Sequence, residues 1–194
     1  AAIGSMREAV TNRRKFIRNT GLGALAFNAA GATVMLTPRA ARAAGIDYRH
    51  LAPADAALLA AFADHVLPGA AAAGVAHFVD QQLGVAPNEC LLMCKYFPEI
   101  RAPFQDFYGA GITALRATVA AQFAAPFATL EAAQKNSLVD ALWRGDIAPW
   151  DGPPPPLFYM MVRSDAVDVV YGTQEGFDEL NVPYLAHIVP PEKW

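Results

Sequence analysis

Side chains that could hold a metal or move a proton are few and widely spaced in this sequence. The chain has four well-separated histidines: His50, His65, His77 and His187. Asp64-His65 and His77-x-x-Asp80 each pair a histidine with a carboxylate, but a structural zinc site usually needs four ligands. These pairs are therefore expected to be packed or surface side chains, and no metal ligand is assigned.

Other catalytic patterns are equally weak. Asp165 and Asp168 share a helix face, where paired carboxylates can do acid–base work, but a solvated stripe is the expected role. Ser137 and Ser164 lack a nucleophile elbow and a linked base. The chain has no Cys-x-x-Cys-His motif, no cysteine set for an iron–sulfur cluster and no Gly-rich phosphate loop. We expect no catalytic residue and no cofactor in this chain.

Cys90 and Cys94 leave several readings open. Exported proteins favour disulfides, and the i,i+4 spacing brings the two α-carbons within bonding range. On a regular helix, however, the side chains run parallel and a bridge would be strained. A disulfide, two buried thiols, a bond to another chain and a metal site all remain as alternatives.

Composition and charge bound the class of protein. The 194 residues are 54% hydrophobic and 17% charged, which excludes intrinsic disorder. Residues 1–43 hold seven basic side chains and one acidic one, whereas residues 44–194 hold eight basic and 17 acidic side chains. The acidic body argues against a nucleic-acid-binding protein, which needs a basic footprint.

The N-terminal forty residues have the organisation of a bacterial export signal. Arg13 and Arg14 stand just before the apolar pair Phe16-Ile17, and the weakly hydrophobic stretch 21–36 follows. Ala41-Arg42-Ala43 then resembles a small-residue cleavage site. The paired arginines indicate the twin-arginine translocase, which carries folded cargo.

Two fates of this signal are open. The apolar middle is short for a membrane span, which favours a cleaved signal over a retained anchor. Residues 1–5, ahead of Met6, are expected to be a cloning remnant. We therefore predict a signal over residues 1–43, a helical domain over residues 44–194 and a periplasmic location.

Apolar periodicity predicts an all-α fold for the body, an irregular helical bundle. The expected helices run from about 53 to 66, 74 to 83, 90 to 96, 103 to 123, from a cap at Thr129 to a stop at Gly145, and 157 to 171. The run Pro153, Pro154, Pro155 and Pro156 is expected to be extended polyproline II. Residues 172–194 are expected to form a coil-like tail.

Two blocks of this sequence resemble the small subunit, subunit 3, of gluconate 2-dehydrogenase. The first is FADHVLPGAAAAGVAHFVD at residues 62–80. The second is VVYGT at residues 169–173, followed by Gly176-Phe177. Their order and spacing agree with the family, and the twin-arginine leader does too.

The resemblance implies a non-catalytic accessory subunit of an oxidoreductase complex. Such subunits accompany a large FAD-containing dehydrogenase of the glucose–methanol–choline type, which oxidises a sugar or sugar acid. A cytochrome c subunit with haem c commonly takes the electrons, and the complex is associated with the inner membrane. The small subunit carries the leaderless flavoprotein out of the cytoplasm. A stand-alone periplasmic binding or scaffold protein, and an enzyme with an unrecognised site, are the alternatives.

Aromatic residues near the C-terminus indicate where the large subunit would bind. Aromatic anchors are enriched in interface cores, and a proline-stiffened strand loses little freedom on docking. The predicted interface is the set Trp150, Pro153, Pro154, Pro155, Pro156, Phe158, Tyr171, Phe177, Tyr184 and Trp194. Packing of these aromatics on the bundle's own core is the alternative.

Overall fold

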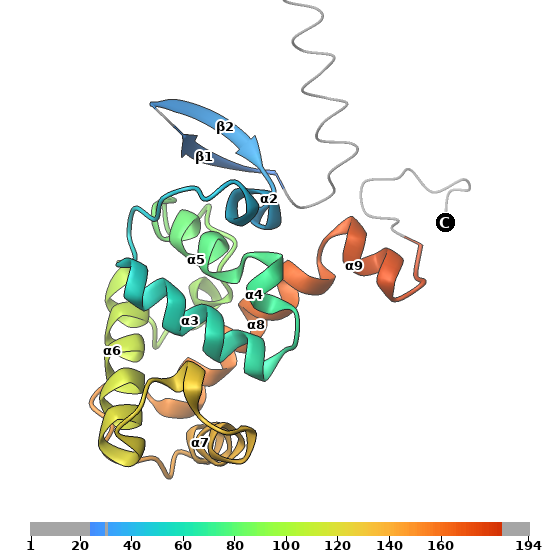
Figure 1. Ribbon diagram of the computed structural model, residues 1–194. Coiled ribbons are helices and arrows are strands. Elements are labelled where there is room, and N and C mark those ends of the chain that lie inside the picture. The colour runs from blue at the N-terminus through green and yellow to red at the C-terminus, as the bar shows by residue number, and fades with distance from the viewer. Residues whose placement is uncertain (1–23, 30, 184–194) are drawn as a thin grey trace, which may run out of the picture.

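The computed structural model describes residues 24–29 and 31–183, which fold into helices topped by one small β-hairpin (Figure 1). The elements in chain order are β1 (Leu25–Ala29), β2 (Ala32–Leu36), α2 (Pro38–Ala43), α3 (Pro53–Val66), α4 (Ala70–Ala73), α5 (Val75–Leu83), α6 (Phe104–Phe123), α7 (Ala132–Arg144), α8 (Pro155–Tyr171) and α9 (Gln174–Glu179). Short 3-10 helices cover Met93–Tyr96 and Phe127–Thr129. Among these residues, no helix has the length and apolar character needed to cross a bilayer.

Helix α8 is the centre of the bundle. It contacts α3, α4, α5, α6, α7 and α9. Its Phe158 is fully buried and lies 6.3 Å from the rings of both Phe62 on α3 and Phe107 on α6. Burial of large aromatic rings dominates core energetics, so these rings join the three longest helices into one core.

Most helices begin or end at the proline and glycine residues from which their ends were predicted. Helix α3 begins at Pro53, the favoured position for a proline in the first helical turn. Helix α7 ends at Gly145, which adopts φ +76°. The cap of α7 was predicted wrongly: Glu131, not Thr129, is the N-cap, and it forms a capping box with Gln134.

The hairpin corrects the prediction of a purely helical fold. β1 and β2 pair antiparallel, with Leu25 opposite Leu36 and Ala29 opposite Ala32. Gly31 lies in the turn at φ +81°, which glycine adopts without strain. Phe27 is 6% exposed, so the hairpin buries this ring on the side of the body. The strands were missed because the apolar stretch 21–36 was assigned to the export signal.

Two further predictions near the C-terminus are corrected. Helix α8 begins at Pro155, so only the first half of the proline run is extended. Proline lacks a backbone N–H and has a helical φ, which suits the first helical turn. Residues 174–179, expected to be coil, form helix α9, whose N-cap Thr173 accepts a hydrogen bond from the Gly176 N–H at 3.2 Å.

Helix α2 is packed on the body. It contacts both α4 and α5, and its Pro38 and Ala41 are buried. The described fold therefore includes residues ahead of Ala44, where the domain boundary was predicted.

Candidate functional site

The residues predicted to direct export fall in two places. Arg13, Arg14, Phe16 and Ile17 lie outside the described residues. The predicted cleavage motif lies on α2, where the Ala41 side chain is fully buried and that of Ala43 is exposed.

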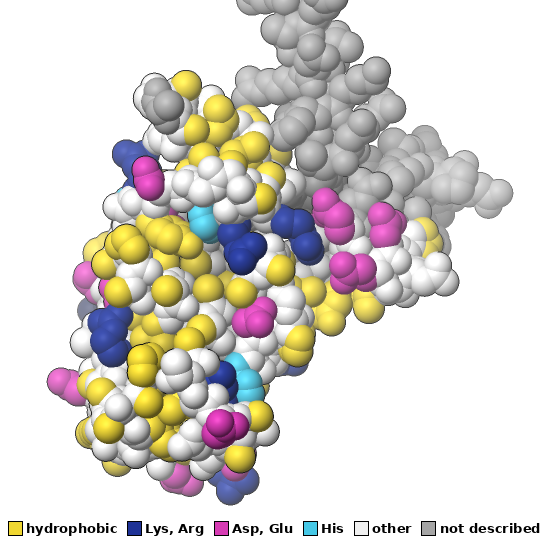
Figure 2. Space-filling view, viewed as in Figure 1, with side chains coloured by type: hydrophobic (Ala, Val, Ile, Leu, Met, Phe, Trp, Pro, Cys, Tyr) yellow, Lys and Arg dark blue, Asp and Glu magenta, His cyan; other side chains and the backbone are white. Residues whose placement is uncertain are grey.

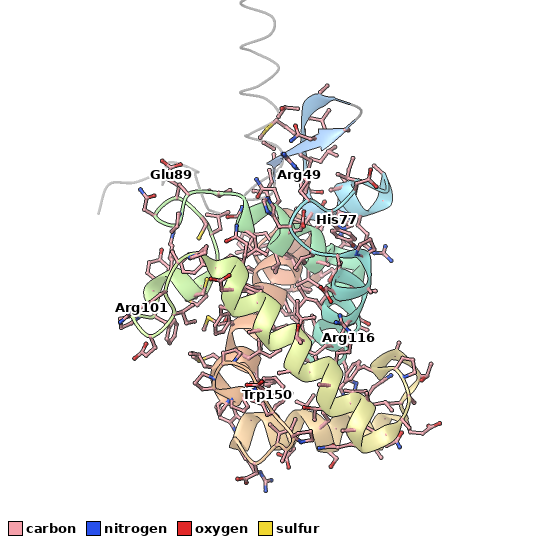
Figure 3. The ribbon with its side chains drawn as sticks, turned by 90° about the vertical axis from the view of Figure 1, so that its left-hand side faces the viewer. Arg49, His77, Glu89, Arg101, Arg116 and Trp150 are labelled. Atoms are coloured by element: carbon pink, nitrogen blue, oxygen red, sulfur yellow. The ribbon has the colours of Figure 1, made fainter. Side chains whose placement is uncertain are left out.

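Asp80 is occupied with holding the loop between α2 and α3. Its carboxylate accepts hydrogen bonds from the backbone N–H groups of Arg49 (3.0 and 3.1 Å), His50 (2.7 Å) and Leu51 (2.8 Å). Figure 3 shows Arg49 near His77, at the end of the molecule that carries the hairpin. A buried carboxylate that accepts several backbone N–H groups in this way fixes the backbone of the loop.

His77 holds an earlier part of the same loop, at Ile46. Its Nε2 lies 3.0 Å from the Ile46 carbonyl oxygen, and its ring centroid is 4.5 Å from that of Tyr48. Burial lowers the pKa of His77, against opposing contributions from the Ile46 hydrogen bond and Asp80. The neutral ring therefore donates its Nε2 proton to Ile46.

The second histidine–carboxylate pair is also structural. Asp64 accepts the N–H groups of Gly69 (3.1 Å) and Ala71 (2.9 Å), while His65 Nε2 lies 2.9 Å from Asn136 Oδ1. Within the described ranges, no three His, Cys, Asp or Glu side chains are grouped as a metal site would need.

A buried acid–phenol pair lies in the core between α6 and α8. The Tyr108 hydroxyl donates to Asp165 Oδ2 at 2.5 Å, and both side chains are fully buried. Burial raises the pKa of Asp165 to about 8, although the Tyr108 hydrogen bond opposes the shift. Because both side chains are 0% exposed, the pair is shielded from solvent in this structure. Asp165 is thus not on a solvated stripe with Asp168, which is exposed.

Cys90 and Cys94 are free thiols in the structure, and both are fully buried. Cys94 lies in the 3-10 helix Met93–Tyr96, whereas Cys90 precedes it. Burial, with the nearby Asp165 carboxylate, raises the pKa of the Cys94 thiol to about 12. A thiol with so little thiolate is a poor nucleophile. The structure holds both cysteines as buried thiols, and whether they pair in the exported protein stays a prediction.

Of the aromatics predicted for the partner interface, the described ones are buried or half-buried. Phe158 is a core residue of this chain, and Trp150 packs 5.9 Å from it while donating its indole N–H to the Pro153 carbonyl at 2.7 Å. Tyr171 and Phe177 are half-buried. Tyr184 and Trp194 lie outside the described residues. Phe158 therefore packs on the bundle's own core, and a partner surface over the other members stays a prediction.

An apolar groove that the sequence analysis missed lies between α3 and the end of α6. It has a volume of about 570 Å³. Its walls are Ala54, Ala57, Leu58 and Ala61 from α3, and Val119, Ala120, Ala124, Ala125, Pro126, Phe127 and Ala128 from the end of α6 and beyond. Arg116, paired with Asp55, stands at its rim. Hydrophobic side chains gather over this face in Figure 2. Alanines at i, i+3 and i+7 from Ala54 were the signal available in the sequence.

A second exposed feature is an aromatic pair at the opposite end of the molecule from the hairpin. Trp143 on α7 is 56% exposed, and its ring packs edge-to-face on Tyr159 of α8 at 5.7 Å.

Comparison with known proteins gives one match. A family model described as gluconate 2-dehydrogenase subunit 3 matches residues 53–187, which is more than half of the chain. No curated protein and no solved structure gives a significant match.

Proposed function

Because this chain belongs to the gluconate 2-dehydrogenase subunit 3 family, we propose that it is the non-catalytic small subunit of a periplasmic FAD-dependent dehydrogenase. The family itself makes it an accessory subunit of a dehydrogenase complex. The proposal adds the role: the chain stabilises the flavoprotein subunit and escorts it through the twin-arginine translocase.

The use of its polar side chains supports a non-catalytic role. Asp64 and Asp80 accept backbone N–H groups, and Asp165 is sealed in the core with Tyr108. Catalytic acids and bases instead face a cavity that admits substrate. The groove between α3 and α6 is lined almost wholly by apolar side chains.

The chemistry belongs to the partners in this proposal. The flavoprotein holds FAD and oxidises a sugar or sugar acid, and a cytochrome c subunit with haem c accepts the electrons. The complex is held at the periplasmic side of the inner membrane. The small subunit contributes the leader, with Arg13 and Arg14 as the recognition pair.

The groove between α3 and α6 is the proposed seat of the flavoprotein subunit. Monomeric proteins rarely leave contiguous apolar area open, and larger open patches mark sites of interaction. The groove runs along two long helices of the bundle and is lined by small side chains, which allow a partner helix or strand to approach closely. The Trp143–Tyr159 pair is a separate exposed surface. The experiment that tests the groove also shows whether the flavoprotein binds at this pair instead.

Replacing both Arg13 and Arg14 by Lys tests the escort role. Lysine keeps the charge but loses the planar guanidinium group. We expect dehydrogenase activity of the co-expressed complex to move from the periplasmic to the cytoplasmic fraction, while total activity is retained. Normal periplasmic activity in this variant would contradict the escort role, and flavoprotein that is soluble, active and exported without this chain would favour a stand-alone function.

A further inference from the structure

We propose that helix α2 is a retained part of the folded subunit, so that the leader is not cut after Ala43 and stays attached to the body. The inference rests on the proposed export function, because only an export signal meets signal peptidase. Of the two fates left open for the leader, cleavage and retention, we infer retention, because residues 37–51 are fixed to the body of the subunit.

Both ends of α2 are closed by specific caps. Thr37 is the N-cap, and its hydroxyl accepts the Ala40 N–H at 3.1 Å. At the other end, the Gly45 N–H bonds to the Arg42 carbonyl and the Ile46 N–H bonds to the Ala41 carbonyl, both at 3.0 Å, with Gly45 at φ +65°. This pair of bonds is a Schellman motif, which ends a helix and satisfies its last carbonyls. The predicted scissile bond, Ala43–Ala44, therefore lies inside a closed helical turn.

The capped helix is then fastened to the body at two points. Pro38 and Ala41 are buried against the segment that includes α4 and α5. Immediately after the helix, the Ile46 carbonyl oxygen lies 3.0 Å from His77 Nε2, and Asp80 takes the N–H groups of Arg49 to Leu51. Helix α5 thus holds the chain on the C-terminal side of the motif, while α4 and α5 cover its buried face.

Gly74 shows how closely the helix is docked. It joins α4 to α5 at φ +87°, and a Cβ added there would collide with the backbone carbonyl of Pro38. Only a glycine permits this approach, because the obstacle is backbone and cannot rotate away.

This geometry makes the motif Ala41-Arg42-Ala43 inaccessible to a peptidase. Small-residue specificity requires the side chains two positions apart, Ala41 and Ala43, to be available together. In α2 the side chain of Ala41 is buried and that of Ala43 is exposed. Proteolysis of such a site requires local unfolding first, at a rate set by the open population. Twin-arginine cargo folds before export, so α2 is docked before the subunit reaches the peptidase.

The N-terminus of the exported subunit tests the proposal directly. The full chain is co-expressed with its dehydrogenase subunit, the complex is purified from periplasm and membranes, and the small subunit is analysed by intact mass and N-terminal sequencing. We expect a chain that begins ahead of Pro38. A chain that begins at Ala44 would overturn the proposal, whereas absence of export would count against the proposed function instead.

A matched pair of glycine variants tests the cause. Gly74→Ala places a Cβ against Pro38 and is expected to undock α2, giving product that begins at Ala44. Gly69→Ala introduces a left-handed alanine at the other end of α4 (φ +95°), but nothing lies within 4 Å of its Cβ. The Gly69→Ala subunit is therefore expected to stay uncut.

Trypsin provides a readout that needs no export. The purified chain is digested briefly, and the fragment beginning at Ala43 is quantified, because Arg42 is exposed on α2. We expect this fragment to appear at least tenfold faster from Gly74→Ala than from Gly69→Ala or the unchanged chain. Equal rates in all three proteins, with unchanged circular dichroism, would overturn the docking of α2.

Discussion

At the scale of single residues, the buried carboxylates of this chain accept hydrogen bonds that hold the fold together. Asp80 gathers three consecutive backbone N–H groups, which a buried loop must satisfy to remain folded. Asp165 instead faces one phenol, and its Oδ1 has no partner among the described residues. A neutral carboxyl is the form that fits this site, because an ion would lack the hydrogen bonds that compensate for lost water.

The protonation of Asp165 predicts how stability depends on pH. The carboxyl has a pKa of about 8 in the folded chain and 3.8 as its ordinary value. Between these two values the unfolded chain loses the proton and the folded chain keeps it, so the free energy of unfolding falls as pH rises from about 4 to about 8. Each pH unit in this window changes the folding equilibrium by up to about tenfold.

Asp165→Asn removes this titration while keeping the size and polarity of the side chain. We expect urea unfolding of the unchanged chain to give a lower midpoint at pH 8 than at pH 5, and we expect the variant to lose most of that difference. Asp64→Asn serves as the control, since Asp64 is a partly exposed loop cap. Identical pH profiles for the unchanged chain and Asp165→Asn would show that Asp165 is ionised in the folded state.

At the scale of elements, the close contact between α6 and α8 depends on a glycine in the middle of a long helix. A Cβ added at Gly111 would meet the ring of Phe158, which is fully buried. Gly109, two residues earlier in the same helix, has open space at its Cβ. Alanine at position 111 therefore tests packing against Phe158, whereas alanine at position 109 tests helix propensity alone.

Alanine at these two positions is expected to have opposite effects. Gly109→Ala should stabilise the chain by about 0.5–1 kcal/mol, because glycine is less favourable than alanine inside a helix. Gly111→Ala should destabilise it by about 1–3 kcal/mol through overpacking against Phe158. Thermal unfolding of both variants measures the difference, and a stabilised Gly111→Ala variant would show that α6 and α8 do not approach as described.

The sequence could predict most helices because each carries its own local signals. Pro53, Gly84 and Gly145 mark helix ends by their backbone chemistry alone. The face on which a side chain lies depends on distant partners, and this is where the predictions were wrong. The spacing of Asp165 and Asp168 shows that they share a helix face, but it does not show that Asp165 meets Tyr108, 57 residues away in sequence.

Site residues were harder to predict for the same reason. Aromatic content near Trp150 and Phe158 suggested a partner surface, yet the bundle's own core takes up Phe158 and much of Trp150. The groove between α3 and α6 is built from alanines, which have no chemical signature of their own. The alanine spacing on α3 indicated one wall, but the opposite wall comes from the end of α6, far away in sequence.

At the scale of the whole molecule, the two ends of the bundle differ in character. The hairpin, α2 and α5 form one end, where backbone of the 37–51 segment is fixed by His77 and Asp80. The groove between α3 and α6 lies on the face below this end and is open (Figure 2). The two features are joined by α3, whose Ala54 lines the groove three residues after Leu51, which Asp80 holds.

The groove predicts where a single charge would block assembly. Ala120 lines the groove from α6 and is exposed, so Ala120→Asp should leave the helix folded while placing a carboxylate in an apolar contact. Arg116, one turn earlier on α6, is already paired with Asp55, so the new carboxylate would be poorly compensated. A buried charge of this kind at an interface costs several kcal/mol, which corresponds to at least about a hundredfold loss of affinity. Co-purification of the flavoprotein with a tagged small subunit should therefore fall to a trace. Ala117→Asp is the matched control, because Ala117 is exposed on the same helix and does not line the groove; it should retain normal co-purification. If Ala120→Asp binds normally while Trp143→Ala loses the partner, the interface lies at the Trp143–Tyr159 pair and the groove is not the seat of the flavoprotein.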